Sequence, residues 1–160
     1  MPSPVEAHAK SYRAKFVAGQ VMFALDAVAR ETGRVVGSGV EYDCFADGEV
    51  RWLDVAFHRL DRLTPERATR EGHCTVVPDL VVEVVSPNDL AEDVNRKRGE
   101  WLAAGAALVW VVFPDVREVH AYSSDGTVRI FRASDALTAA PVLPGFSTPV
   151  ADLFRLPTTG

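Results

Sequence analysis

Two acidic side chains interrupt one of the most apolar stretches of the chain. The stretch reads PDLVVEVVSP at residues 78–87, and the two acids are Asp79 and Glu83. Alternate side chains of a β-strand point to the same face, so a strand here would place both carboxylates on one side of a sheet. A buried carboxylate is normally paired with a cation, hydrogen-bonded or bound to a metal, because its desolvation is costly. The stretch therefore predicts a metal site or a buried ion pair.

A third acid has similar surroundings. Asp54 lies between apolar neighbours in the run RWLDVAF. Two carboxylates from neighbouring strands can hold a hard divalent cation such as Mg²⁺, which prefers carboxylate oxygen and keeps several waters. Such an ion polarises a phosphoryl oxygen and lowers the pKa of a bound water. Asp54 and Glu83 are therefore candidate ligands of a hydrolytic metal site.

A lysine beside the metal would complete such a site, because its charge can orient the attacking water or stabilise developing negative charge. Lys97 is the candidate, since it lies in the segment that follows the acidic strand. It is one of only three lysines in the chain, and the other two, Lys10 and Lys15, belong to the N-terminal region. The sequence thus predicts a site built from Asp54, Glu83 and Lys97.

Each of these assignments has a simpler alternative, which the sequence leaves open. Glu83 could form a buried ion pair with an arginine of residues 58–70. Lys97 could be a solvated helix lysine paired with Asp93, four residues earlier. If the acids only anchor buried arginines, Glu83→Gln would destabilise the fold without changing metal affinity.

The elements before the acidic strand can be predicted from spacing and turn residues. Residues 12–31 have apolar side chains at helical spacing, and Gly33 suits the end of a helix. Short runs with β propensity follow, at residues 34–40, 41–45 and 49–57. The pair Asp47-Gly48 favours a hairpin between the last two runs, with Asp54 inside its second strand. Thr64-Pro65-Glu66 favours the start of a short helix.

The elements after it alternate between strand and helix. A second helix is predicted over 88–105, with Ser86 as its N-terminal cap and Gly105 at its end. A strand is expected at 107–113, and a hairpin is expected to pair 115–122 with 127–132. Residues 139–154 are expected to form an ordered loop that packs on the core. This order predicts a mixed α/β fold, a central sheet with a helix on each face.

Composition limits the class of protein. A chain of 160 residues with 48% hydrophobic and 24% charged residues predicts one globular domain over 1–160. No apolar run approaches the ~20 residues that span a bilayer, and no signal peptide is recognisable, so we expect a cytoplasmic protein without membrane association. Cys44 and Cys74 lack metal-binding spacing and are expected to be free thiols. The net charge of −5 weighs against binding nucleic acid through a general positive field. It is still compatible with binding through a local basic patch.

The segment PDLVVEVVSPNDLAEDVNRKRGEWLAAGAALVWVVFPDVREVHAY resembles the central segment of the bacterial restriction-endonuclease-like family called Uma-two, in the PD-(D/E)XK nuclease superfamily. The family has a run similar to PDLVVEVLSPS, then an acid-rich helix with a lysine, AGV and a YWVVDP-like strand. The likeness extends to DGEVRWLDVAFHRLDRL upstream and VLPGFSTPVADLF downstream, so it covers about residues 16–154.

The resemblance implies a restriction-endonuclease-like fold and cleavage of DNA with Mg²⁺ or Mn²⁺. It implies that Asp54 and Glu83 bind the metal and that Asp79 is a further ligand or a supporting group. Lys97 would replace the lysine of the superfamily's E-x-K triplet, whose place here is taken by Val85. Such nucleases commonly act as homodimers that reach both DNA strands. An unidentified protein partner is also compatible with the resemblance.

The chain departs from the family pattern at three places. Leu53 stands where the family commonly has a proline before the upstream acid. The acid usually seen in the first helix is absent from FVAGQVMFAL, where Gln20 is the nearest polar residue and hence a candidate supporting group. The acid after the tryptophan strand is replaced by Phe113. The missing helix acid, the displaced lysine and the acidic net charge favour a second hypothesis: a binding or regulatory module that keeps the fold without efficient catalysis.

Overall fold

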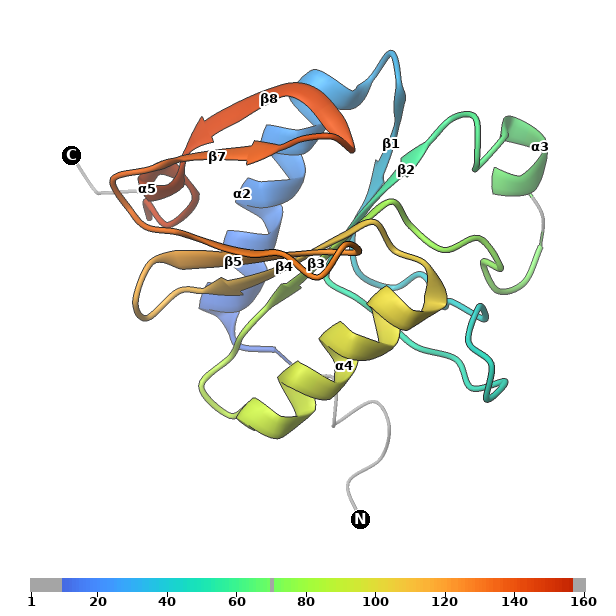
Figure 1. Cartoon of the computed structure of the whole chain (residues 1–160), viewed down its shortest axis with the longest axis horizontal. Helices are drawn as coiled ribbons and strands as arrows, with labels where there is room; N and C mark the ends of the chain where they lie inside the picture. Colours follow the sequence, from blue (N-terminus) through green and yellow to red (C-terminus); the bar gives the residue numbers. More distant parts are fainter. Residues whose placement is uncertain (1–9, 70, 157–160) are drawn as a thin grey trace.

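A six-stranded mixed sheet forms the centre of the molecule, and one long helix covers each of its faces (Figure 1). The computed structural model describes residues 10–69 and 71–156. The elements are α2 (Tyr12–Ala29), β1 (Gly33–Val36), β2 (Val55–Arg59), α3 (Pro65–Ala68), β3 (Leu80–Val84), α4 (Ala91–Ala104), β4 (Leu108–Phe113), β5 (Glu118–Ser123), β6 (Val128–Phe131), β7 (Ala136–Ala139), β8 (Leu143–Pro149) and α5 (Val150–Leu153). The predicted α/β class, with a mixed sheet flanked by helices, is confirmed.

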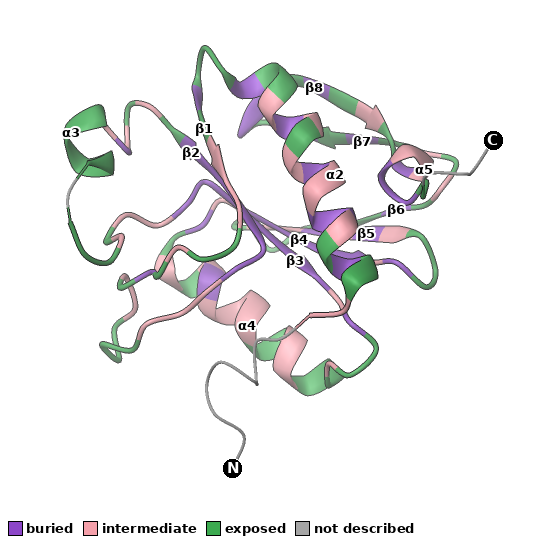
Figure 2. Ribbon diagram, turned by 180° about the vertical axis from the view of Figure 1, so that it is seen from behind, coloured by how far each residue is buried: buried purple, intermediate pink, exposed green. Residues whose placement is uncertain are grey.

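The six strands lie in the order β1-β2-β3-β4-β5-β6, and buried residues concentrate in the central ones (Figure 2). Only β3 and β4 run parallel among these neighbours; the other pairs are antiparallel. A parallel pair needs a long crossover connection, and α4 provides it. The strand, helix and strand predicted around the acidic stretch are therefore the unit that orders the sheet.

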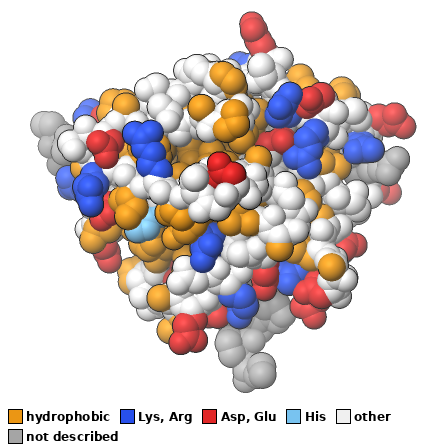
Figure 3. All heavy atoms as spheres, viewed as in Figure 1, with side chains coloured by type: hydrophobic (Ala, Val, Ile, Leu, Met, Phe, Trp, Pro, Cys, Tyr) orange, Lys and Arg blue, Asp and Glu red, His pale blue; other side chains and the backbone are white. Residues whose placement is uncertain are grey.

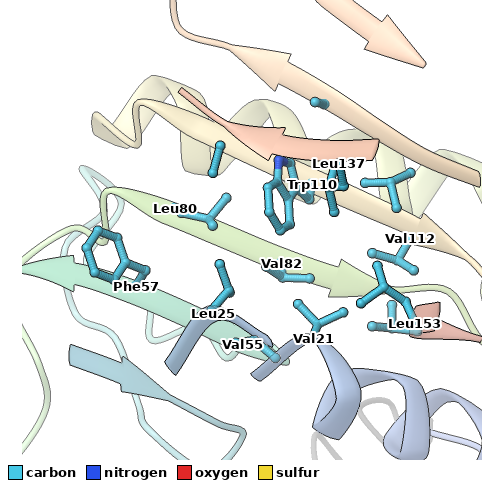
Figure 4. Close-up of a cluster of buried hydrophobic side chains, with 14 of the residues drawn as sticks. Val21, Leu25, Val55, Phe57, Leu80, Val82, Trp110, Val112, Leu137 and Leu153 are labelled. Atoms are coloured by element: carbon cyan, nitrogen blue, oxygen red, sulfur yellow. The ribbon is translucent and has the colours of Figure 1, made fainter. Parts of the chain in front are cut away.

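Helix α2 covers one face of the sheet. Its first turn is capped by Ser11, whose hydroxyl accepts the backbone N–H of Ala14 at 3.2 Å. Its buried stripe recurs every four residues, and Val21 and Leu25 point toward Val55 and Val82 of the sheet (Figure 4). The helix begins where the sequence predicts and ends two residues earlier, at Ala29.

Strand β3 separates two apolar cores. Leu80, Val82 and Val84 pack on the α2 side, whereas Val81 packs with Trp101 of α4 on the other side. This alternation is the one that the sequence predicts, and it assigns Glu83 to the α4 side of the sheet. The carboxylate of Glu83 therefore lies between the sheet and the second helix.

Helix α4 begins later than the sequence predicts. It starts at Ala91 with no side-chain cap, and it ends at Gly105, whose φ of 117° suits glycine. The expected cap, Ser86, is wrong. Its backbone N–H donates to Asp89 Oδ2 at 2.8 Å, and its hydroxyl accepts the N–H of Ser11 at 2.8 Å. Ser86 thus connects the loop before α4 to the start of α2.

The three runs predicted as strands before residue 58 form less strand than expected: 34–40 and 49–57 are strand only within β1 and β2, and 41–45 forms no named strand. Between β1 and β2 an irregular loop, residues 37–54, is closed by one antiparallel bridge between Tyr42 and Arg51, around the expected Asp47-Gly48 turn. The Arg51 guanidinium holds the loop by donating to Asp47 at 2.6 Å and to Glu100 of α4 at 2.7 Å. Tyr42 is fully buried against Trp101. These side-chain contacts replace a strand ladder and fix the loop beside α4.

The C-terminal segment packs on the core, as expected, but as regular structure. Strands β7 and β8 form a hairpin that leads into α5. Alternate residues of β7 are buried, so Leu137 joins the α2-side core with Leu143, Phe146 and Val150. The prolines and glycine of this segment suggested an irregular loop, whereas the burial of these apolar side chains stabilises a hairpin.

In the described part of the chain no helix is both long and apolar enough to cross a bilayer. Cys44 and Cys74 are free thiols.

A buried histidine makes the stability of the fold sensitive to acid. His58 in β2 is 1% exposed, and its Nε2 lies 3.0 Å from the hydroxyl of Tyr42. Burial lowers the pKa of His58 from 6.5 to about 4. Between these values the unfolded chain binds the proton and the folded protein does not, so stability falls as the pH is lowered from 6.5 to 4.

We expect this histidine alone to lower the free energy of unfolding by about 3 kcal/mol over that interval. Urea denaturation of the protein and of His58→Gln at pH 7 and pH 4.5 measures the effect, because glutamine keeps a hydrogen-bonding group for Tyr42 without titrating. Equal losses of stability in both proteins would show that His58 is not the acid-sensitive group.

Candidate active site

Asp54 and Glu83 are neighbours across two strands. Asp54 directly precedes β2, so it lies at the strand start rather than within the strand as predicted. Its N–H donates to the carbonyl of Val82 at 3.2 Å, and its Oδ2 accepts the N–H of Val84 at 2.7 Å. Val55 pairs with Val82, and one further step of this antiparallel register places Asp54 opposite Glu83. Two acids that lie far apart in the sequence therefore share one place on the sheet.

Glu83 is buried without a cation bound to it. Its side chain belongs to a residue that is 7% exposed, and its Oε1 has no hydrogen-bond partner among the described residues. Among those residues no arginine or lysine nitrogen lies within 4.0 Å of its carboxylate. The described arginines of residues 58–69 therefore do not pair with Glu83.

One arginine of that region, Arg62, is bound by Asp79 instead. Arg62 donates to Asp79 Oδ1 at 2.7 Å, and the backbone N–H of Arg59 donates to Oδ2 at 2.8 Å. Asp79 is 5% exposed, lies at the opposite end of β3 from Val84, and does not line the cleft that contains Glu83. Both of its oxygens are occupied, so the structure does not bring this predicted ligand to the other two acids.

We expect Asp79→Asn to lower the free energy of unfolding by about 1–3 kcal/mol, because hydrogen bonds to a charged group are lost at a buried position. Metal affinity should stay unchanged. Chemical denaturation and calorimetric metal titration measure the two quantities, and Asp61→Asn is the matched control, since its ion pair with Arg59 is exposed. A loss of metal binding in Asp79→Asn with full stability would return Asp79 to the metal site.

An open cleft of about 380 Å³ contains both paired acids. Its lining includes Asp54, Glu83 and Lys97, together with the other two lysines of the chain, Lys10 and Lys15. All three lysines of the chain line this cleft, whereas none of its fourteen arginines is among the lining residues. From the sequence alone, Lys10 and Lys15 belong only to the N-terminal region, and the scarcity of lysine is the one signal that singles them out.

Lys97 reaches the cleft from α4. It is half-buried, and its charge lowers the pKa of both Asp54 and Glu83. Asp93, the partner expected if Lys97 were only a helix-surface lysine, is bound by Arg96 at 3.2 Å. Val85, which occupies the place of the usual lysine, lies just beyond β3. The structure therefore brings Lys97 to the two acids from the following helix, where the resemblance implies it should be.

The electrostatics of the two acids favour a bound cation. Burial raises the pKa of Glu83, and the neighbouring Asp54 charge raises it further. Burial also raises the pKa of Asp54, against the opposing charges of Lys10, Lys15 and Lys97. A cation between the acids would relieve both the desolvation and the repulsion. The site is therefore more stable with positive charge added to it.

The oxygen ligands present fit Mg²⁺ or Mn²⁺. Glu83 Oε1 is a buried acceptor with no hydrogen-bond partner in the described part of the chain, and Asp54 uses Oδ2 for the N–H of Val84. Within residues 10–69 and 71–156 no group of three or more His, Cys, Asp or Glu side chains forms a fuller ligand set. A hard ion that keeps several waters suits two carboxylates, whereas a fully protein-coordinated structural metal does not.

Gln20, the remaining predicted supporting group, is not brought to this cleft. It lies on α2, is half-buried, and is not among the residues that line the cleft. Phe113, which stands in place of a family acid, packs against the ring of His120 at a centroid distance of 4.5 Å. The acidic side chains that line the cleft are thus Asp54, Glu83 and Glu41, and Glu41 is paired with His73 at 2.6 Å.

Comparison with known proteins gives one family and one fold. The family model described as "Uma2: Putative restriction endonuclease" matches residues 2–151. The chain is similar to a solved structure from Anabaena variabilis, described as a putative nuclease belonging to DUF820, with 16% identity and a TM-score of 0.78. The match covers 90% of this chain and 81% of that chain. No curated protein matches the sequence.

Proposed function

Because the chain belongs to the Uma2 family, described as "Putative restriction endonuclease", we propose that it is a divalent-metal-dependent endonuclease that hydrolyses phosphodiester bonds of DNA. The observation that carries the proposal is the pair of buried carboxylates, Asp54 and Glu83, in an open cleft with Lys97. Among the residues that the structure describes, one oxygen of Glu83 has no hydrogen-bond partner there. A nuclease-like role follows from the family, and the metal and the substrate are what we add to it.

In the proposed mechanism each residue has a separate role. Asp54 and Glu83 would hold Mg²⁺ or Mn²⁺, which when bound supplies polarisation of a phosphoryl oxygen and a water of lowered pKa. The N–H of Val84 orients Asp54 through its Oδ2, so that carboxylate is fixed before any ligand arrives. Lys97 would stabilise the negative charge that develops on the phosphate as water attacks and the leaving oxygen departs.

The charge distribution bears on how DNA would bind. The net charge is −5, and on the face in Figure 3 basic and acidic side chains are interspersed without a broad field of one sign. We therefore propose that DNA is bound through the few cations near the cleft, with an affinity that falls steeply with salt. A homodimer, or an unidentified protein partner, would add binding surface and allow both strands to be cut. We propose a cytoplasmic location.

Cleavage of supercoiled plasmid by the purified protein tests the proposal. We expect nicked and linear products with Mg²⁺ or Mn²⁺ and none with EDTA. A protein that binds Mn²⁺ and DNA but leaves the plasmid and single-stranded oligonucleotides intact would instead be the binding or regulatory module. The position of Lys97 in the cleft supports the enzyme over that alternative, because the displaced E-x-K lysine is one of the three features that favour the binding module.

A further inference from the structure

Lys10 is held in the cleft by a defined set of contacts. The segment that contains it runs from the start of α2 toward α4 (Figures 1 and 2). The amine of Lys10 donates to Asp89 Oδ2 at 2.6 Å, and the side chain of Lys10 is only 9% exposed. The same Asp89 oxygen accepts the N–H of Ser86 at 2.8 Å. The loop before α4 therefore fixes the position of Lys10.

A second set of contacts fastens the same segment. The N–H of Ser11 donates to the hydroxyl of Ser86 at 2.8 Å, and the two serine hydroxyls lie 3.2 Å apart. Ser11 also caps α2. Residues 10 and 11 are thus joined to residues 86 and 89, which lie just beyond the strand that carries Glu83. This arrangement orders a long, flexible lysine side chain that would otherwise be mobile in solvent.

The contacts leave Lys10 able to bind a further group. An ammonium group has three donors, and the hydrogen bond to Asp89 uses one of them. Lys10 lines the cleft with Asp54 and Glu83, and it also lines the adjoining cavity of about 290 Å³ with Lys97 and Glu83. Burial disfavours its charged form, but the carboxylates of Asp54, Asp89 and Glu83 raise its pKa overall. Lys10 is therefore a charged donor beside the proposed metal site.

A substrate phosphate is the group that this arrangement fits. Metal bound by Asp54 and Glu83 would offset their two charges, and the pair of Lys10 with Asp89 is itself neutral. A phosphodiester brings an additional negative charge, and hydrolysis spreads more charge over its oxygens. Lys97 enters from the α4 side, whereas Lys10 enters from the segment before α2. Cations on both sides would fix the phosphate between them.

We propose that Lys10 is a substrate-binding residue of the cleft, which donates to a phosphate oxygen of bound DNA and is held for that purpose by Asp89 and Ser86. This inference rests on the proposed function. A lysine that only fastened the N-terminal segment would contribute to stability but not to the number of phosphates neutralised on binding. The dependence of DNA affinity on salt separates these two roles.

The test measures binding of a labelled DNA duplex by fluorescence anisotropy without divalent metal, at several salt concentrations. For Lys10→Met we expect roughly tenfold weaker binding, and a slope of log affinity against log salt that is smaller by about one. Lys10→Arg should restore the slope, because it restores the charge. Arg30→Met is the matched control, since Arg30 is an 80% exposed cation at the far end of α2. Its slope should equal that of the wild type.

Thermal unfolding of each variant accompanies the binding curves. If Lys10→Met fails to fold, Lys10→Met with Asp89→Asn removes both charges of the pair and keeps the test possible. An unchanged slope in a folded Lys10 variant overturns the inference and leaves the proposed function standing, provided that the wild type binds DNA. A wild type that binds no DNA at low salt overturns both.

Discussion

Glu83→Gln is expected to abolish DNA cleavage and at the same time to stabilise the fold. The substitution keeps the shape of the side chain but removes a metal ligand and its charge. Metal assistance supplies several kcal/mol to such reactions, so we expect a loss of at least about 10³-fold in cleavage rate. The stability should change in the opposite direction, because Glu83 is buried and Oε1 has no partner among the described residues. Plasmid cleavage with Mn²⁺ and urea denaturation without metal measure the two effects.

The stabilisation should depend on pH in a defined direction. Burial and the Asp54 charge raise the pKa of Glu83, so the unfolded chain releases this proton at lower pH than the folded protein does. The stability associated with Glu83 is therefore complete below its ordinary pKa of 4.5 and is lost as the pH rises through the folded value. We expect Glu83→Gln to match the wild type at pH 4.5 and to exceed it by about 1–3 kcal/mol at pH 9.

An opposite result would identify a different role for Glu83. If it were the anchor of a buried ion pair, Glu83→Gln would be less stable than the wild type at neutral and alkaline pH. Adding Mn²⁺ provides an internal control, because an ion that binds only the folded protein raises its stability. That increase should occur in the wild type and be absent from Glu83→Gln.

Lys97→Met is expected to reduce cleavage by about 10²–10³-fold while leaving metal binding intact. Lys97 lines the cleft, and its positive charge favours the ionised form of both acids by lowering their pKa, but its ammonium group is not a metal ligand. Its removal takes away positive charge near the proposed ion, so Mn²⁺ should bind at least as tightly as before. The expected result is a slow enzyme with a fully loaded metal site, which single-turnover cleavage and calorimetric titration would reveal together.

The matched control is Arg96→Met, one residue earlier on the same helix. Arg96 is 60% exposed in its side chain, pairs with Asp93, and lines the adjoining cavity but not the cleft that contains Asp54. Its loss should change cleavage by less than about threefold, since exposed ion pairs contribute little. Equal losses in both variants would mean that Lys97 contributes only general positive charge to DNA binding.

Local sequence signals were enough to predict β3 and α4, the strand and helix that carry Glu83 and Lys97. The acids of β3 and their shared face follow from strand alternation, and Gly105 marks the end of α4 because its φ of 117° suits glycine. Asp54 was recognisable as an acid among apolar neighbours, although its position at the start of β2 was not. These features depend on residues close together in the chain.

The features that the sequence did not reveal depend on distant contacts. Lys10 joins the site through Asp89, 79 residues away, and no local pattern indicates that pairing. Asp79 resembled a metal ligand in sequence, but Arg62 lies close enough in space to bind it. The loop at residues 37–54 has short β-leaning runs that form only the Tyr42–Arg51 bridge with each other, and its Arg51 side chain bonds to Glu100, 49 residues away. A long-range ion pair is present in all three cases.

Calorimetric titration of Mn²⁺ into the purified protein decides whether Asp54 and Glu83 form a metal site. We expect the wild type to bind Mn²⁺, Asp54→Asn and Glu83→Gln each to weaken binding by at least about 100-fold, and Asp79→Asn to leave it unchanged. Unfolding curves for the same samples confirm that each variant is folded. A wild type that takes up no Mn²⁺, or binding that survives both substitutions at Asp54 and Glu83, would contradict the claim that these two carboxylates form a metal site.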